Sequence, residues 1–79
     1  MSDATKGVYQ ENVGNWMRDE RVTLNLSQVE LAKLLDVSDS TISNWERAQA
    51  SMSAEAHARI SYIFKRRRRD LNLTERATL

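Results

Sequence analysis

The chain has 79 residues, 41% of them hydrophobic and 29% charged, and a formal net charge of +1. This is the composition of a small folded domain, because a chain of this length can enclose only one hydrophobic core. The absence of cysteine and the single histidine exclude disulfides, cysteine-ligated metals and multi-histidine sites, so we expect no metal or cofactor. Because long apolar runs and a leader-like N-terminus are absent, we also expect a cytoplasmic protein with no membrane segment.

The N-terminal part of the chain is predicted to hold one helix after a flexible lead at residues 1–9. Asn12 is a suitable N-cap for this helix, because an asparagine side chain accepts hydrogen bonds from unpaired backbone N–H groups. The inward face is predicted from apolar residues at helical spacing, which are Val13, Trp16, Met17 and Val22. The segment 24–26 then interrupts the helix.

Two short helices are predicted next, and each begins at a serine. Ser27 is followed three residues later by Glu30, a spacing typical of a capping box, and Ser38 is the N-cap of the second short helix. The first of the two ends near Asp36. Apolar residues at helical spacing predict their buried stripe, which consists of Leu31, Ala32, Leu35, Ile42 and Trp45.

A longer fourth helix follows, capped by Ser51 or Ser53. Its inward face is predicted to consist of Ala56, Ile60, Ile63 and Phe64. The helix runs into a basic segment at residues 65–69. We therefore expect four helices and no sheet, with a folded domain at residues 10–70 and a C-terminal tail at residues 71–79.

Several apolar residues have no place in this predicted core. Leu34 and Tyr62 fall off the core stripes and are candidates for a subunit contact. The tail carries three further leucines, Leu71, Leu73 and Leu79. Such a tail is typical of a dimerisation element, because a two-fold partner can bury what one subunit cannot. A frayed terminus is the alternative.

Charge is distributed unevenly along the chain. Residues 1–50 carry a net charge of −3, whereas residues 51–79 carry +4, most of it in the run from Lys65 to Arg69. A basic run of this density favours an anionic partner. A solvated helix end is the alternative interpretation.

The spacing of the two short helices is that of a helix-turn-helix. Counted from Gln28, the apolar positions fall at offsets 3, 4, 7, 9, 14 and 17. Ala32 must be small where the second helix crosses it, and Val37 is expected to fill the turn. Two short helices separated by about three non-helical residues are the helix-turn-helix arrangement.

At these residues the chain resembles the Cro/C1-type helix-turn-helix regulators of phages, plasmids and bacteria. The resemblance is close over residues 26–47 and looser over residues 12–64. It implies an all-α fold, a compact bundle of four to five helices of the lambda-repressor-like DNA-binding type. It also implies that a recognition helix at residues 38–47 enters the major groove of DNA.

The resemblance implies DNA contacts for seven side chains. Those expected at base edges are Asp39, Ser40 and Asn44, and those expected at bases or phosphates are Thr41 and Ser43. Those expected at the DNA backbone are Gln28, which also steadies the recognition helix, and Arg47. The chemistry agrees, because asparagine pairs with adenine, aspartate accepts from cytosine, and hydroxyl groups donate or accept.

The resemblance also implies structural roles within the motif. It pairs Glu46 with Arg21 in an internal salt bridge that orients the recognition helix, and breaking such a pair costs about 3–5 kcal/mol when it is buried. Asp36 and Ala48 stand where the family usually has glycine. A left-handed backbone is therefore expected at Asp36, with some cost.

The function implied is that of a sequence-specific transcriptional regulator, a repressor that binds a palindromic double-stranded DNA operator as a homodimer. We expect no small-molecule effector, because 79 residues leave no room for an effector domain. The alternative is an antitoxin-like or anti-repressor-like protein-interaction module, which the acidic first half, Leu34 and the apolar tail favour. We expect no enzymatic activity, because no histidine–carboxylate constellation or phosphate-binding glycine loop occurs.

Overall fold

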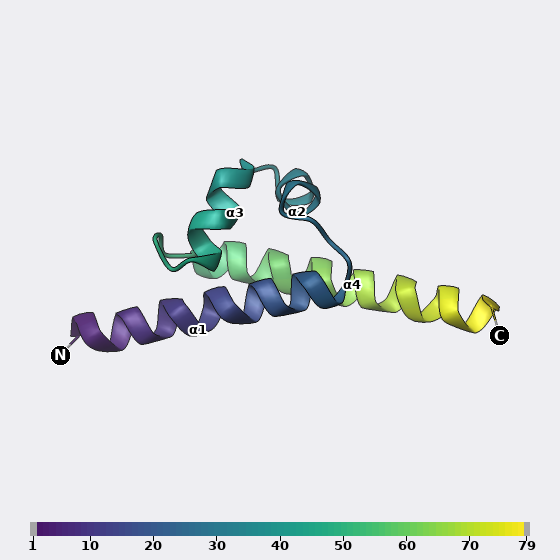
Figure 1. The fold of residues 1–79 in the computed structure, drawn as a ribbon, viewed down its shortest axis with the longest axis horizontal. Helices are drawn as coiled ribbons and strands as arrows, with labels where there is room; N and C mark the ends of the chain where they lie inside the picture. The colour runs from purple at the N-terminus through teal and green to yellow at the C-terminus, as the bar shows by residue number, and fades with distance from the viewer. Residues whose placement is uncertain (1, 79) are drawn as a thin grey trace.

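The computed structural model describes the backbone of residues 2–78 and the side chains of residues 11–72. The described chain forms four helices, α1 (Ser2–Thr23), α2 (Gln28–Leu35), α3 (Asp39–Glu46) and α4 (Ala54–Thr78). The long helices α1 and α4 contact each other, and the short helices α2 and α3 lie on one side of them (Figure 1). The prediction of an all-α fold with a helix-turn-helix is confirmed.

α1 begins earlier than predicted. It is continuous from Ser2 to Thr23, so Asn12 lies inside the helix and the prediction of an N-cap there is wrong. Residues 2–9 are helical where the sequence predicts a flexible lead. This stretch contains no proline, and its one glycine, Gly7, costs only about 1 kcal/mol relative to alanine in a helix.

α4 continues through the predicted boundary at residue 70 and ends at Thr78. No glycine or proline occurs after Ala54, so no residue there breaks the helix. Leu71 packs against the edge of the core, which corrects the expectation that a four-helix core has no place for it. The side chains of Leu73 and Leu79 lie outside the described residues.

The buried apolar side chains form one core cluster between the four helices. Its members are Met17, Leu24, Leu26, Leu31, Ala32, Leu35, Ile42, Ile60 and Phe64. Leu24 and Leu26 were missed as core residues, since the sequence predicts only a helix break there. They are buried because the chain turns back at the end of α1, with the Leu26 N–H bonded to the carbonyl oxygen of Arg21 at 3.0 Å.

Two apolar positions predicted to point inward are exposed. Val22 is 61% exposed, because it follows the buried Met17 by five residues and so falls off the helical stripe. Val37 is 36% exposed, so its side chain does not fill the turn between α2 and α3 as predicted. Its backbone closes that turn, since the Val37 N–H donates to the carbonyl oxygen of Ala32 at 3.0 Å.

The predicted serine caps are confirmed. The Ser27 hydroxyl accepts from the Glu30 N–H at 3.0 Å, and the Glu30 carboxylate accepts from the Ser27 N–H at 3.1 Å. These bonds hold the pKa of Glu30 below its usual value of 4.5, so the stability that the cap contributes is lost as the pH falls through that lowered pKa. Ser38 caps α3 through the Thr41 N–H, and of the two serines before α4 it is Ser53 that caps it, through the Ala56 N–H.

Among the residues that the structure describes, three other than glycine have a left-handed backbone: Asn25, Asp36 and Ala48, with φ of 59°, 60° and 59°. This confirms the expectation at Asp36. The Asp36 N–H bonds to the carbonyl oxygens of Ala32 and Lys33, so the strained residue forms the C-cap that ends α2.

Replacing Ala48 with glycine is therefore expected to raise the free energy of unfolding by about 0.5–1 kcal/mol, because glycine adopts a left-handed backbone without the steric cost that alanine bears. Urea denaturation followed by circular dichroism measures the change. Ala58→Gly is the matched control, since Ala58 is an exposed residue inside α4 and should lose a similar amount. A loss of stability in both variants would contradict the prediction.

Candidate nucleic-acid interface

α3 exposes one polar face and buries the other side. Ile42 and Glu46 are buried, and Trp45 packs against the core. The remaining side chains are exposed or half-buried, and they include five of the predicted DNA contacts, Asp39, Ser40, Thr41, Ser43 and Asn44. The structure thus gathers these five residues on a single short helix, and Arg47 is exposed directly after it.

The start of α3 is fixed by its cap. The Ser38 hydroxyl accepts from the Thr41 N–H at 3.2 Å and lies 2.9 Å from the Thr41 hydroxyl. Thr41 is therefore half-buried and already hydrogen-bonded, whereas Asp39 and Ser40 are exposed. The polar groups most available to a ligand lie in the first turn of α3.

The end of α3 is fixed by an ion pair behind it. The Arg21 guanidinium donates to both oxygens of the Glu46 carboxylate, from Nε to Oε2 at 2.7 Å and from Nη2 to Oε1 at 3.2 Å. The third guanidinium nitrogen, Nη1, donates to the carbonyl oxygen of Leu26 at 2.8 Å. The predicted pair is confirmed. Because it is partly buried, loss of either partner would leave the other charge unpaired away from water.

Gln28 joins this network from the first residue of α2. Its amide nitrogen donates to Glu46 Oε1 at 3.1 Å, so the start of α2 is tied to the end of α3. The position of this side chain agrees with the steadying role that the sequence predicts for Gln28. Its contact with phosphate stays a prediction.

Gly14 is a structural residue that sequence reasoning missed. A Cβ atom at this position would lie 2.6 Å from the carbonyl oxygen of Trp45 and 2.7 Å from that of Glu46. α1 therefore crosses the last turn of α3 at a distance that only glycine permits. The available signal was an isolated glycine within a helical pattern, which often marks close packing.

The basic run at the end of α4 is partly used inside the fold. The Arg67 guanidinium donates from Nε to the carbonyl oxygen of Leu24 at 3.0 Å, and Arg68 forms an ion pair with Glu20. The Arg66 guanidinium carbon lies 5.9 Å from the centre of the Tyr62 ring. Part of the run thus fastens α4 to the end of α1, a use that neither sequence interpretation anticipated.

A metal cluster and a membrane-spanning helix are both absent from the described residues. Among them, no group of three or more histidine or acidic side chains is placed to hold a metal ion. Nor does any helix of the described chain have the length and apolar character needed to cross a membrane. His57 stacks on Trp16, with ring centres 4.9 Å apart, at the contact between α1 and α4.

Comparison with models of protein families matches residues 17–61 to a helix-turn-helix family, over more than half of the chain. The matched region begins at Met17, within α1, and ends at Ser61, within α4, so it includes the whole of α2 and α3. It is a DNA-binding family whose members are typically not enzymes. Searches among curated proteins and among solved structures find no match.

Proposed function

The chain belongs to the helix-turn-helix family of the Cro/C1 type, and we propose that it is a sequence-specific transcriptional regulator. In this proposal it acts in the cytoplasm, where it binds a palindromic operator as a homodimer and represses transcription by covering promoter DNA. The observation that carries the proposal is the polar face of α3, which is held from behind by the contacts of Glu46 and Gly14.

The exposed and half-buried polar groups of α3 suit the reading of base edges. Asn44 has an amide that can pair with the two edge groups of adenine in the major groove, and Asp39 can accept from the amino group of cytosine. Ser40 can donate or accept at several bases. In this proposal these three side chains determine sequence preference, and Thr41 and Ser43 contact bases or phosphates beside them.

Gln28 and Arg47 hold the domain on the DNA backbone in this proposal. They flank α3, one at the start of α2 and one directly after the last residue of α3. Contacts to phosphate position a protein on DNA without reading its sequence. A substitution at Arg47 should therefore weaken binding to all sequences alike, whereas one at Gln28 also removes the hydrogen bond to Glu46 that ties α2 to α3.

A dimer would account for recognition of a palindrome. Helix-turn-helix dimers place their recognition helices about 34 Å apart, which is one turn of DNA, so a two-fold symmetric protein reads a two-fold symmetric site. We expect no small-molecule effector, and regulation would follow protein concentration.

The second candidate function is an antitoxin-like or anti-repressor-like module that binds another protein. The exposed apolar side chains of Leu34 and Tyr62, 56% and 59% exposed, favour it. Salt distinguishes the two functions, because an interface built on phosphate contacts weakens steeply as salt rises, whereas an apolar protein interface does not. Selection from a random DNA pool at two salt concentrations is the direct test. An enriched two-fold symmetric site supports the regulator, and no enrichment by the folded protein contradicts it.

Replacing Asn44 with alanine is expected to cost about 1–3 kcal/mol of discrimination between the selected operator and random DNA, which is the usual contribution of one good base contact. Fluorescence anisotropy with both DNAs measures the difference. Asn12→Ala is the matched control, because Asn12 is an exposed asparagine on α1. If a folded Asn44→Ala protein keeps full discrimination, α3 does not read bases through this residue.

A further inference from the structure

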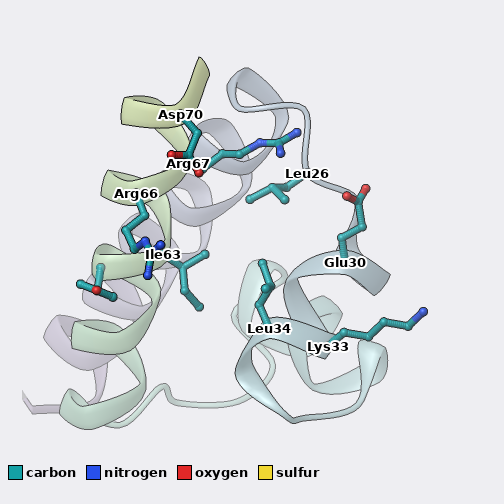
Figure 2. A pocket seen from close by; sticks show the side chains of 9 residues that line it. Leu26, Glu30, Lys33, Leu34, Ile63, Arg66, Arg67 and Asp70 are labelled. Atoms are coloured by element: carbon teal, nitrogen blue, oxygen red, sulfur yellow. The ribbon is translucent and has the colours of Figure 1, made fainter. Parts of the chain in front are cut away.

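The fold divides the basic run of α4 into two parts that face in different directions. Arg67 donates to the carbonyl oxygen of Leu24 at 3.0 Å, just after the end of α1. Arg68 forms an ion pair with Glu20 of α1. Figure 2 shows Arg67 reaching across to the loop before α2, whereas the neighbouring Arg66 lies along α4. The fold thus uses Arg67 and Arg68 to hold its own helices together, and other cations of α4 face elsewhere.

The outward face of α4 carries a row of cations around one tyrosine. Ile60 and Phe64 are buried, and Tyr62 lies two residues from each of them, which is about 200° of helical rotation. Tyr62 therefore lies on the opposite side of α4, where it is 59% exposed. The cations at helical spacing from Tyr62 are exposed as well, and they are Arg59, Lys65, Arg66 and Arg69. We refer to Tyr62 and these four cations as the outward row.

All charges of the outward row are positive. No acidic residue occurs between Glu55 and Asp70, so the row contains none. Arg59, Lys65 and Arg69 form no ion pair with any residue that the structure describes. Like charges on neighbouring turns of a helix repel one another, so an anion bound along the row would relieve this repulsion. From Arg59 to Arg69 the row is about 15 Å long, so it fits a ligand with several negative charges in a line.

An open hollow lies beside the tyrosine of this row. It has a volume of about 410 Å³, and it is lined by Leu34 of α2 and by four residues of α4, Ala58, Arg59, Tyr62 and Ile63. The groove of Figure 2 adjoins it, and Arg66 lines that groove with its guanidinium carbon 5.9 Å from the centre of the Tyr62 ring. The hollow is therefore apolar, with an arginine before it and another after it along α4. It suits a flat group of low polarity that is joined to negative charges.

A nucleobase on its phosphate backbone has this chemistry. Proteins that bind single-stranded nucleic acid combine a positively charged track for the phosphates with aromatic side chains on which bases stack. Duplex DNA does not fit the hollow, because its bases are stacked on one another inside the double helix. An acidic peptide matches the charges alone. The aromatic ring among the cations therefore favours a single strand.

The outward row is separate from the proposed operator-reading face. α3 packs against α1 and α2, and α4 packs against the same two helices. α3 and α4 therefore occupy opposite corners of the domain, and their outward faces point in different directions. A duplex bound along α3 leaves the outward row uncovered.

We propose that the outward row of α4 is a second nucleic-acid site, which binds a single-stranded polynucleotide. Its four cations contact phosphates, and one base stacks on Tyr62 within the hollow beside Leu34. These contacts involve phosphates and the faces of bases but no sugar hydroxyl, so both RNA and single-stranded DNA bind. The site goes beyond the proposed function, because α3 takes no part in it.

Fluorescence anisotropy tests the site, with a labelled oligothymidine and a labelled oligouridine each titrated with the full chain. Both strands should bind, and their affinity should fall as salt rises. Tyr62→Ala should weaken binding by about tenfold, because it removes the stacking surface, whereas Tyr62→Phe should retain the affinity of the wild type. Neither substitution changes the charge of the protein, and circular dichroism shows whether each variant is folded.

The salt dependence of binding tests the cations. Arg66→Gln should flatten the slope of log affinity against log salt by about 0.7, which is the contribution of one phosphate contact on a single strand. Combining it with Arg59→Gln and Arg69→Gln should flatten the slope by about 2. Arg18→Gln is the matched control, because Arg18 is an exposed arginine of α1 outside the row. It removes the same charge as Arg66→Gln and should leave the slope unchanged.

Three results would overturn the site: a folded wild-type protein that binds neither strand, a Tyr62→Ala variant that binds as tightly as the wild type, or a polyglutamate peptide of equal charge that displaces the strand. The last result would identify an acidic protein segment as the ligand. Selection of a duplex operator is measured separately, so failure here is distinct from failure of the proposed function. A protein that binds single strands through Tyr62 but selects no operator would support this site and contradict the regulator. A protein that selects an operator but binds no single strand would do the reverse.

Discussion

Replacing Arg21 with alanine should lower the free energy of unfolding by about 3–5 kcal/mol, because it leaves a buried charge without its partner. Glu46 is only 5% exposed, and Arg21 supplies two of the hydrogen bonds that hold its carboxylate. After the substitution, the donor that remains from the network is the amide of Gln28. The carbonyl oxygen of Leu26 also loses its donor. Small domains have a total stability of about 5–15 kcal/mol, so this loss is a large share of it.

Urea denaturation followed by circular dichroism measures this loss. Arg18→Ala is the matched control, since Arg18 is an exposed arginine of the same helix that bonds Asn15, and an exposed contact of this kind contributes at most about 1 kcal/mol. Equal losses in the two variants would contradict the prediction.

A double substitution identifies the source of the loss. Arg21→Met combined with Glu46→Met removes both charges, and apolar replacements of a buried pair are often tolerated at little cost. Most of the stability should return, although the orientation of α3 then lacks its ion pair. A double variant as unstable as Arg21→Ala would mean that the unbonded Leu26 carbonyl or lost packing, rather than the unpaired charge, causes the loss.

The parts of the fold that the sequence predicts well are those determined within a few residues. Ser27 and Glu30 are three residues apart, and Ser38 and Thr41 likewise, so both caps follow from local hydrogen bonding. The buried apolar residues of α2 and α3 likewise follow from the helical spacing of neighbouring residues. The pairing of Arg21 with Glu46 spans 25 residues, and only the resemblance to a known family predicts it.

The features that the sequence does not predict depend on contacts between distant segments. Leu24 and Leu26 are buried because the turn after α1 folds back onto the core. From the sequence, the basic run at residues 65–69 is interpreted as a solvated helix end or an anion-binding segment. In the structure, Arg67 donates to the carbonyl oxygen of Leu24, which is 43 residues away. The ends of helices are equally hard to predict where few residues signal a boundary. For this reason α1 and α4 are both longer than predicted. For the candidate site, the sequence predicts which residues gather on α3, but the crossing that supports it depends on the close approach of two helices at Gly14.

Replacing Gly14 with alanine is therefore expected to destabilise the domain by about 2 kcal/mol and to lower the melting temperature by about 10 °C. The added methyl group would lie within 2.7 Å of two backbone oxygens of α3, and backbone atoms cannot move without moving the helix. Alanine favours the helical state of α1 by about 1 kcal/mol over glycine, so the observed loss is the cost of the clash less this gain. Because α3 must shift to relieve the clash, affinity for the selected operator should fall as well.

Gly7→Ala is the matched control, because it makes the same substitution in the same helix. It should raise the melting temperature, because alanine favours the helical state by about 1 kcal/mol over glycine. Differential scanning calorimetry measures both variants, and DNA titration of the folded fraction shows whether α3 has moved. If Gly14→Ala is stabilised as much as Gly7→Ala, α1 does not press on the last turn of α3. The orientation of α3 would then depend on the Arg21–Glu46 pair rather than on the crossing at Gly14.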